Sequence, residues 1–185
     1  MARKTKDSTT LEKIPSKTKD EIIKEAQRIE ESTLYSAKGH LVAASLWSHF
    51  HLIIGVPIVI MSAIAGLSIL SEFDKTKTIG AILTLGVTGL SALMTFLNPN
   101  AKSNTHLNSG NSYDALNNKI RIFRTIDCWR EKSEDILTEK IKYFSEQKDK
   151  LNSSSPQIHW IAYQLAKRGL EKGEAEFRVD KVVRQ

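Results

Sequence analysis

The sequence contains a single cysteine, Cys128, among its 185 residues. An internal disulfide is therefore excluded, and so little cysteine suits a reducing compartment. Histidine does not predict a zinc site, because His49 and His51 lie two residues apart and would point to nearly opposite sides of a helix. The sequence contains no glycine-rich phosphate loop, nucleophile elbow or HExxH motif. It therefore predicts neither an enzyme nor a bound cofactor or metal.

Charged residues are missing from two long stretches, residues 39–71 and 78–101, which contain no Asp, Glu, Lys or Arg. The connector between them carries two acids and two lysines, so the formal net charge of +6 lies on the two flanks. Basic flanks beside a membrane are held against anionic lipid headgroups, and the composition thus predicts the lipid bilayer as a partner. Nucleic acid is disfavoured, because basic and acidic residues are interspersed and no aromatic stacking platform is visible.

Two uninterrupted apolar runs, residues 52–70 and 79–97, lie inside these stretches. Each nineteen-residue run would form a helix of about 28 Å at ~1.5 Å per residue, close to the ~30 Å thickness of the hydrocarbon core. Pro57 falls in the first turns of the first run, where a helix tolerates proline best. Two buried helices of a soluble protein are the alternative. Two full-length runs joined by a short polar turn disfavour it.

The predicted fold is all-α, with a hairpin of two transmembrane helices at residues 51–71 and 79–97. Residues 72–78 are predicted to form a short periplasmic turn. Because an even number of spans leaves both termini on one side, the positive-inside rule and the long flanks predict that both termini are cytoplasmic. No ionisable residue lies in the core of either span, which argues against a proton pump or an ion-coupled transporter.

The N-terminal flank is predicted to combine a disordered arm with an amphipathic helix. Residues 1–17 are rich in lysine and contain Pro15, a composition typical of a disordered basic arm. Thr18 and Glu21 have the spacing of a capping box and would begin a cytoplasmic or interfacial helix over residues 18–50. The apolar positions of this helix are Ile22, Ala26, Ile29, Thr33, Ala37 and Val42.

The C-terminal flank is predicted to form cytoplasmic helices over residues 98–151 and a C-terminal helix and tail over residues 152–185. The face of the first helix is marked by Leu107, Gly110, Tyr113, Leu116, Ile120 and Phe123. A second helix fits residues 133–151, with Ile136, Leu137, Ile141 and Phe144 as its apolar positions. Residues 152–155 would be a linker, and Pro156 suits the first turn of a last helix whose apolar positions are Ile158, Ile161, Ala162 and Leu165. The apolar faces of the flank helices are expected to pack between subunits.

Hydroxyl side chains form a stripe on the second span. At ~100° per residue, four of them fall within a ~60° arc that Gly80 and Asn98 extend at the two ends: Thr84, Thr88, Ser91 and Thr95. Such hydroxyls can bond the carbonyl four residues earlier or simply pack, so helix packing and pore lining both remain open. Two helices cannot enclose a channel, so a pore would require a homo-oligomer.

Small residues form a second pattern on the spans. Gly55, Ser62 and Gly66 fall within a ~40° arc of the first span, and Gly86 with Gly89 lies opposite the hydroxyl stripe of the second. Small residues spaced in this way let two helix backbones approach closely. The pattern predicts that one glycine notch packs against the other within the hairpin. The hydroxyl stripe would then face other subunits or a water-filled path.

Several short motifs occur in a fixed order along residues 37–66 and 95–116. His51 and Leu52 precede Gly55-Val56-Pro57, Asn98-Pro99 closes the second span, and these are followed by His106, Gly110 and Tyr113. In these motifs the chain resembles the SLATT family of bacterial two-helix membrane effector domains. The resemblance covers roughly residues 20–150, and the tail from Asn152 has no counterpart in it.

The resemblance implies an effector of anti-phage systems linked to cyclic-oligonucleotide signals. Such a protein would oligomerise and permeabilise the bacterial inner membrane when an upstream nucleotide-signalling or sensor protein reports infection, an abortive response. No nucleotide pocket is visible in the sequence, so a partner would deliver the signal. The main alternative is a non-conducting oligomeric anchor or scaffold that recruits a partner defence protein. A membrane-tethered nucleic-acid binder is the third reading.

Overall fold

The computed structural model describes residues 17–70 and 74–177, and every regular element within them is helical. The all-α fold is confirmed. The predicted disordered arm lies outside the described residues except for Lys17, which is the first residue of helix α1. Part of the predicted turn and the end of the C-terminal tail also lie outside them.

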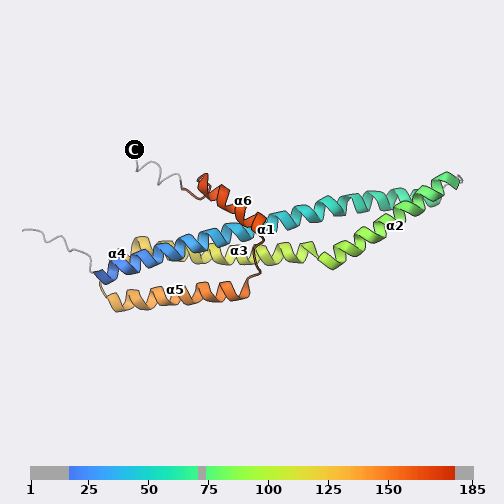
Figure 1. Cartoon of the computed structure of the whole chain (residues 1–185). Helices are drawn as coiled ribbons and strands as arrows, with labels where there is room; N and C mark the ends of the chain where they lie inside the picture. Colours follow the sequence, from blue (N-terminus) through green and yellow to red (C-terminus); the bar gives the residue numbers. More distant parts are fainter. Residues whose placement is uncertain (1–16, 71–73, 178–185) are drawn as a thin grey trace, which may run out of the picture.

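Helix α1 is one continuous helix over Lys17–Ile69, 53 residues long (Figure 1). The predicted flank helix and first span are therefore parts of a single element, with no break at residue 51. Pro57 lies deep in the interior of α1 and not in its first turns, so its missing N–H leaves the carbonyl of Ile53 without the usual helical donor. We call residues 51–69 of α1 together with helix α2 (Asp74–Leu97) the apolar hairpin.

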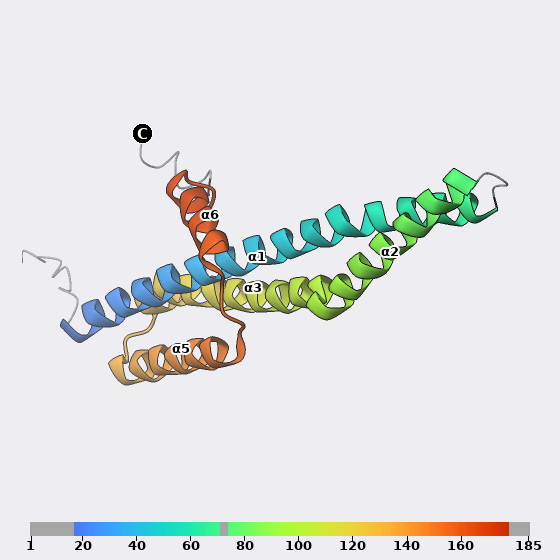
Figure 2. The same cartoon turned by 45° about the vertical axis from the view of Figure 1, so that its right-hand side comes forward.

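Helices α2 (Asp74–Leu97) and α3 (Pro99–Ile122) run back along α1, as Figures 1 and 2 show. Helix α2 ends at Leu97, as predicted, but begins five residues before the predicted start of the second span. The predicted turn at residues 72–78 is therefore shorter, because no glycine or proline between residues 74 and 79 stops a helix.

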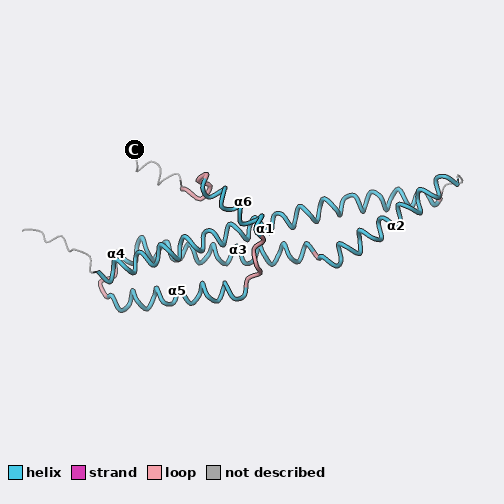
Figure 3. The backbone as a smooth tube through the Cα atoms, viewed as in Figure 1, coloured by secondary structure: helices cyan, strands magenta, loops and turns pink. Residues whose placement is uncertain are grey.

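Asn98 separates α2 from α3 (Figure 3). It adopts the left-handed conformation, φ 43° and ψ 58°, which asparagine tolerates better than most residues. Its side chain accepts a hydrogen bond from the backbone N–H of Ala101 at 3.3 Å, and Pro99 occupies the first turn of α3. The predicted start of the C-terminal helices at Asn98-Pro99 is confirmed.

An apolar core joins the parts of the chain that lie away from the hairpin. Its buried residues come from α1, α3, the π-helix η1 (Phe123–Asp127), α4 (Cys128–Arg130) and α5 (Glu134–Ser154): Ile22, Ala26, Ile29, Leu116, Ile120, Phe123, Cys128, Leu137 and Ile141. The flank faces predicted to pack between subunits therefore pack against each other within one chain. We call residues 17–50 of α1 together with these elements and α6 (Trp160–Glu171) the helical base.

Two apolar positions predicted on the base helices lie at the surface instead. Leu107 is 41% exposed and Ile136 is 44% exposed, because neighbouring positions on each helix, such as His106 and Leu137, face the core. In α5 the side chain of Ser133 caps the helix by accepting from the N–H of Ile136.

Helix α6 (Trp160–Glu171) packs against α1 and differs most from the prediction (Figure 2). The predicted linker at residues 152–155 belongs largely to α5, and Pro156 precedes α6, whose N-cap is His159. The buried face of α6 consists of small residues, Ala162, Ala166 and Gly169, whereas Ile161 and Leu165 are each 43% exposed. Small residues allow the two helices to approach closely, which is why the larger ones are left outside.

Candidate functional site

Within residues 17–70 and 74–177, two segments are long and apolar enough to cross a membrane. One lies in α1 and the other in the run that begins with α2; only 11% and 6% of their most apolar windows are buried. Helices in the core of a soluble protein would be mostly buried. The low burial of these two helices therefore indicates that lipid or another protein chain covers the hairpin. This surface is the candidate functional site.

Helix α1 and helix α2 present different outward surfaces. The exposed positions of α1 in the hairpin are mainly large and aliphatic: Leu52, Ile53, Val56, Val59, Ile60, Ile64 and Leu67. Between residues 84 and 95, the exposed positions of α2 are mostly small or carry a hydroxyl: Thr84, Gly86, Thr88, Gly89, Ala92 and Thr95, beside Leu85 and Leu93. The first surface suits hydrocarbon, and the second suits close helix packing or water.

The residues of α2 fall into three parallel stripes. The stripe against α1 alternates steps of three and four, the spacing of a helix–helix seam: Gly80, Leu83, Val87, Leu90, Met94 and Leu97. The predicted hydroxyl stripe follows it by one residue, about 100° around the helix. Gly86 and Gly89 each precede a seam residue by one position, so they lie about 100° from the seam on the side away from the hydroxyl stripe. Ser91 is half-buried beside the seam, and Gly80 lies in the seam and not on the hydroxyl stripe.

The threonines of the stripe are bonded within their own helix. The hydroxyls of Thr84, Thr88 and Thr95 donate to the carbonyls of residues 80, 84 and 91 at 2.8–2.9 Å. Each hydroxyl oxygen keeps acceptor capacity directed away from that bond. The stripe can therefore lie against a neighbouring helix without an unsatisfied donor, and it can also present oxygen atoms to water. Asn98, predicted to extend the stripe, uses its side chain to cap α3.

The predicted glycine-to-glycine packing inside the hairpin is wrong. A Cβ atom built on Gly55, Gly66, Gly86 or Gly89 would meet nothing within 4 Å. Ser62 is exposed and its hydroxyl donates to the carbonyl of Ile58. The helices approach closely elsewhere: a Cβ on Gly80 would lie 2.8 Å from Cβ of Ser68. The reason is the direction of the seam, which passes through Ala65 and Ser68 and leaves the other small residues facing outward.

Three of the family-motif residues meet on one side of α1. His106, Gly110 and Tyr113 are buried on α3, and a Cβ on Gly110 would lie 2.9 Å from the side chain of Leu41. His51 and Pro57 are exposed on the hairpin and lie apart from this group. The motif therefore divides into a packing cluster in the base, two surface positions on α1, and the Asn98-Pro99 junction between α2 and α3.

His40, which the sequence did not single out, is the partner of His106. Their Nδ1 atoms are 2.9 Å apart, so one ring donates and the other accepts. Tyr113 stacks on His40 with ring centroids 5.5 Å apart, and its hydroxyl donates to Oδ1 of Asn152 on α5. Burial, together with the charge of His106, lowers the pKa of His40 to about 4, and burial also lowers the pKa of His106. Both rings are therefore neutral at pH 7. His40 lies seven residues after Thr33, about two helical turns along the buried stripe of α1, and this spacing could have indicated that His40 is buried.

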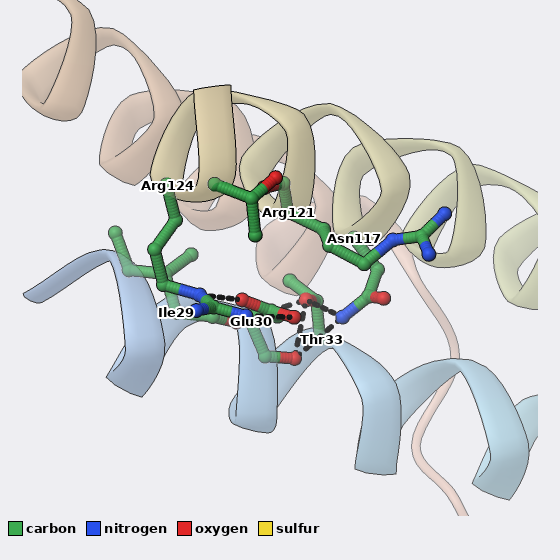
Figure 4. A network of polar contacts seen from close by, with 7 residues as sticks. Ile29, Glu30, Thr33, Asn117, Arg121 and Arg124 are labelled. Atoms are coloured by element: carbon green, nitrogen blue, oxygen red, sulfur yellow. Dashed lines mark hydrogen bonds and ion pairs between the residues drawn. The ribbon is translucent and has the colours of Figure 1, made fainter. Parts of the chain in front are cut away.

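A polar network ties α3 and η1 to α1 further along the base (Figure 4). Nε and Nη2 of Arg124 donate to the Glu30 carboxylate at 2.6 and 3.3 Å. The side-chain amide of Asn117 donates to the Glu30 carbonyl and to the hydroxyl of Thr33, which itself donates to Ile29. These bonds fix the register of the two antiparallel elements. They are the second group that sequence reasoning missed.

Comparison of the chain with protein-family models, with curated proteins and with solved structures finds no match. The resemblance to the SLATT family therefore stays a prediction, and the surface of the hairpin is the feature of the chain that bears on function.

Proposed function

We propose that the apolar hairpin spans a membrane twice and that copies of the chain assemble into a pore that permeabilises it. The observation that carries this proposal is the difference between the two outward surfaces. Large aliphatic side chains make up most of the exposed surface of α1 in the hairpin. On α2, six of the eight exposed positions between residues 84 and 95 are small or carry a hydroxyl, and the other two are Leu85 and Leu93. In such an assembly α1 faces lipid and α2 faces neighbouring subunits and the conduction path.

The geometry of α2 gives the two remaining stripes separate roles. Gly86 and Gly89 leave room for the backbone of a neighbouring helix, as small residues do in membrane interfaces. The hydroxyl stripe, about 200° away around the helix, then faces the axis of a closed ring. There its oxygen atoms replace part of the hydration of an ion.

The proposed topology places both termini and the helical base in the cytoplasm and residues 74–77 on the periplasmic side of a bacterial inner membrane. The base then receives the signal of an upstream nucleotide-signalling or sensor protein, as the family resemblance implies. A constitutively open pore would kill its host, so the resting assembly is closed and opens on this signal or on overexpression. The effector thus belongs to an abortive anti-phage response.

A non-conducting anchor that recruits a partner defence protein is the second candidate. The bonds from Thr84, Thr88 and Thr95 to their own helix favour it, because hydroxyls satisfied in this way need no water. In that case the stripe is a packing surface only.

Expression in bacterial cells separates the two candidates. The variant Thr84→Val, Thr88→Val, Ser91→Ala, Thr95→Val removes every hydroxyl of the stripe with little change in volume. The matched control Ser62→Ala removes an exposed hydroxyl of α1. At equal amounts in the membrane, the parent and the control should depolarise cells and stop growth, and the stripe variant should do neither. Equal toxicity of the stripe variant would favour the anchor.

A further inference from the structure

A pocket of about 690 Å³ opens where the apolar hairpin meets the helical base. Its walls come from α1, the end of α2, the first turns of α3 and the start of α6, and they include Leu46, Trp47, Phe50, Leu97, Lys102 and Ile161. This volume lies within the ~300–1,000 Å³ range of small-molecule sites. The pocket is therefore large enough to hold a substantial part of an amphipathic molecule.

The chemistry of the pocket is divided between apolar walls and one cation. Leucine, isoleucine, alanine and aromatic side chains form most of the lining, and Nζ of Lys102 lies 4.6 Å from the centre of the Trp47 ring. Among the described residues that line the pocket, none is Asp or Glu. A ligand complementary to this surface is largely hydrocarbon and carries a negative charge at one end.

The level of the pocket matches the headgroup layer of a bilayer that the hairpin would span. Phe50 and Leu97 border the apolar runs. Trp47 precedes residue 52 by five positions and Lys102 follows residue 97 by five, about 8 Å along each helix. The headgroup region adds roughly 5–8 Å to each side of the hydrocarbon core. The Lys102 ammonium therefore lies where lipid phosphates lie.

We infer that this pocket binds one anionic phospholipid of the cytoplasmic leaflet. The phosphate meets Lys102 above the Trp47 ring, the first carbons of an acyl chain lie between Leu46 and Ile161, and the chain leaves the pocket past Phe50 and Leu97 toward the hydrocarbon core. A zwitterionic lipid fits less well, because its cationic group would approach Lys102. A free phosphate would leave the apolar walls uncovered. This inference rests on the insertion of the hairpin in the membrane and not on conduction.

The position of α6 gives the bound lipid a structural consequence. Ala162 and Ile161 of α6, together with Pro156 in the loop before it, share the pocket with α1 and α2. A lipid in the pocket therefore contacts both α6 and the hairpin and holds them together. Anionic lipid should raise the thermal stability of the chain in detergent and slow proteolysis within residues 155–159, the loop that precedes α6.

Native mass spectrometry of the full chain in a neutral detergent tests the inference. Phosphatidylglycerol and phosphatidylcholine with identical acyl chains are titrated in parallel. We expect one phosphatidylglycerol per chain, bound at least about tenfold more tightly than phosphatidylcholine. Lys102→Glu should abolish this preference. Lys119→Glu makes the same charge change about 25 Å further along α3 and should retain it.

A second variant separates loss of the pocket from loss of charge. Leu46→Trp fills the pocket without changing its charge and should weaken the binding of both lipids to the same extent. If Lys102→Glu loses its helical circular dichroism, binding of the two lipids to Leu46→Trp tests the pocket in its place. Equal binding of the two lipids by the parent would overturn the inference. So would an unchanged preference in Lys102→Glu. Displacement of phosphatidylglycerol by glycerol phosphate at similar concentration would assign the pocket to a soluble anion instead.

Discussion

Arg124 and Glu30 form an ion pair between η1 and α1 with side chains only 28% and 19% exposed. Arg124→Ala leaves the Glu30 carboxylate half-buried without this partner, so we expect the free energy of unfolding to fall by about 1–3 kcal/mol. Arg28→Ala is the matched control, because Arg28 pairs with Glu25 at 2.8 Å but both side chains are well exposed. Its effect should stay within about 0.5 kcal/mol. Thermal unfolding in detergent measures both; equal losses would show that the network in the base contributes nothing specific.

The buried histidine pair predicts a dependence of stability on pH. The pKa of His40 is about 4 in the folded chain against 6.5 for a free histidine. Between pH 6.5 and 4 the unfolded chain therefore binds a proton that the folded chain does not. The free energy of unfolding should fall as the pH falls through this window, by up to about 3 kcal/mol, and should not change above it for this reason.

The double variant His40→Leu, His106→Leu checks the origin of that dependence. Replacing both hydrogen-bonding partners by apolar groups removes the titration and leaves no orphaned polar atom. Its midpoint of unfolding should change less between pH 7 and pH 4.5 than that of the parent. His51→Leu, at an exposed position, should behave as the parent does. If the double variant and the parent share one pH profile, other groups cause the dependence.

Residue patterns indicated some partners and missed others for a physical reason. Gly110 and Tyr113 were placed correctly on the packed face of α3, since burial at helical spacing is a local property. The pairing of His40 with His106 joins residues 66 positions apart, and the bonds of Asn117 and Arg124 to Glu30 span 87 and 94 positions. Such pairs depend on the register of two antiparallel helices, which no local pattern determines.

Among the elements, the contact between α1 and α2 gives the clearest prediction. Gly80→Leu places a side chain against Ser68 and must push the helices apart, at a cost of about 1–3 kcal/mol. Gly86→Leu has open space within the chain and should leave the unfolding of the monomer unchanged. It should instead reduce the oligomeric fraction seen by light scattering. If Gly86→Leu destabilised the monomer and Gly80→Leu did not, the glycine-to-glycine packing that the sequence suggested would be correct after all.

The sequence was informative about elements where apolar residues repeat without interruption, and less so at their boundaries. The end of α2 at Leu97 followed from Asn98-Pro99, which prevents a helix from continuing. The flank helix and the first span, predicted over the adjoining residues 18–50 and 51–71, form one helix, because a change from polar to apolar composition does not interrupt backbone hydrogen bonds. On α6 the buried Ala162 was predicted correctly. Ala166 and Gly169 were not, because close helix approach selects small residues, whereas the sequence pattern pointed to Ile161 and Leu165.

For the whole molecule, the exposed hairpin predicts self-assembly. The flank faces that were expected to join subunits are used within the chain, so the hairpin provides the contacts between copies. We expect a symmetric homo-oligomer of at least about four chains in several mild detergents, because fewer hairpins cannot surround a water-filled path. Light scattering coupled to gel filtration measures this state. A monodisperse monomer in every detergent would exclude a ring.

The central claim is that the hydroxyl stripe of α2 lines a conducting path, and efflux of dye or ions from proteoliposomes tests it most directly. The parent is compared with the variant Thr84→Val, Thr88→Val, Ser91→Ala, Thr95→Val at matched incorporation and over a range of protein-to-lipid ratios. No upstream sensor protein is present in the vesicles, so a high density of the chain in the membrane is used to drive assembly and opening. Efflux through the parent should rise steeply with density, whereas the variant should stay at the rate of protein-free vesicles, because apolar side chains dry the path. If the variant leaks as fast as the parent, the stripe is only a packing surface and the pore assignment on α2 is wrong.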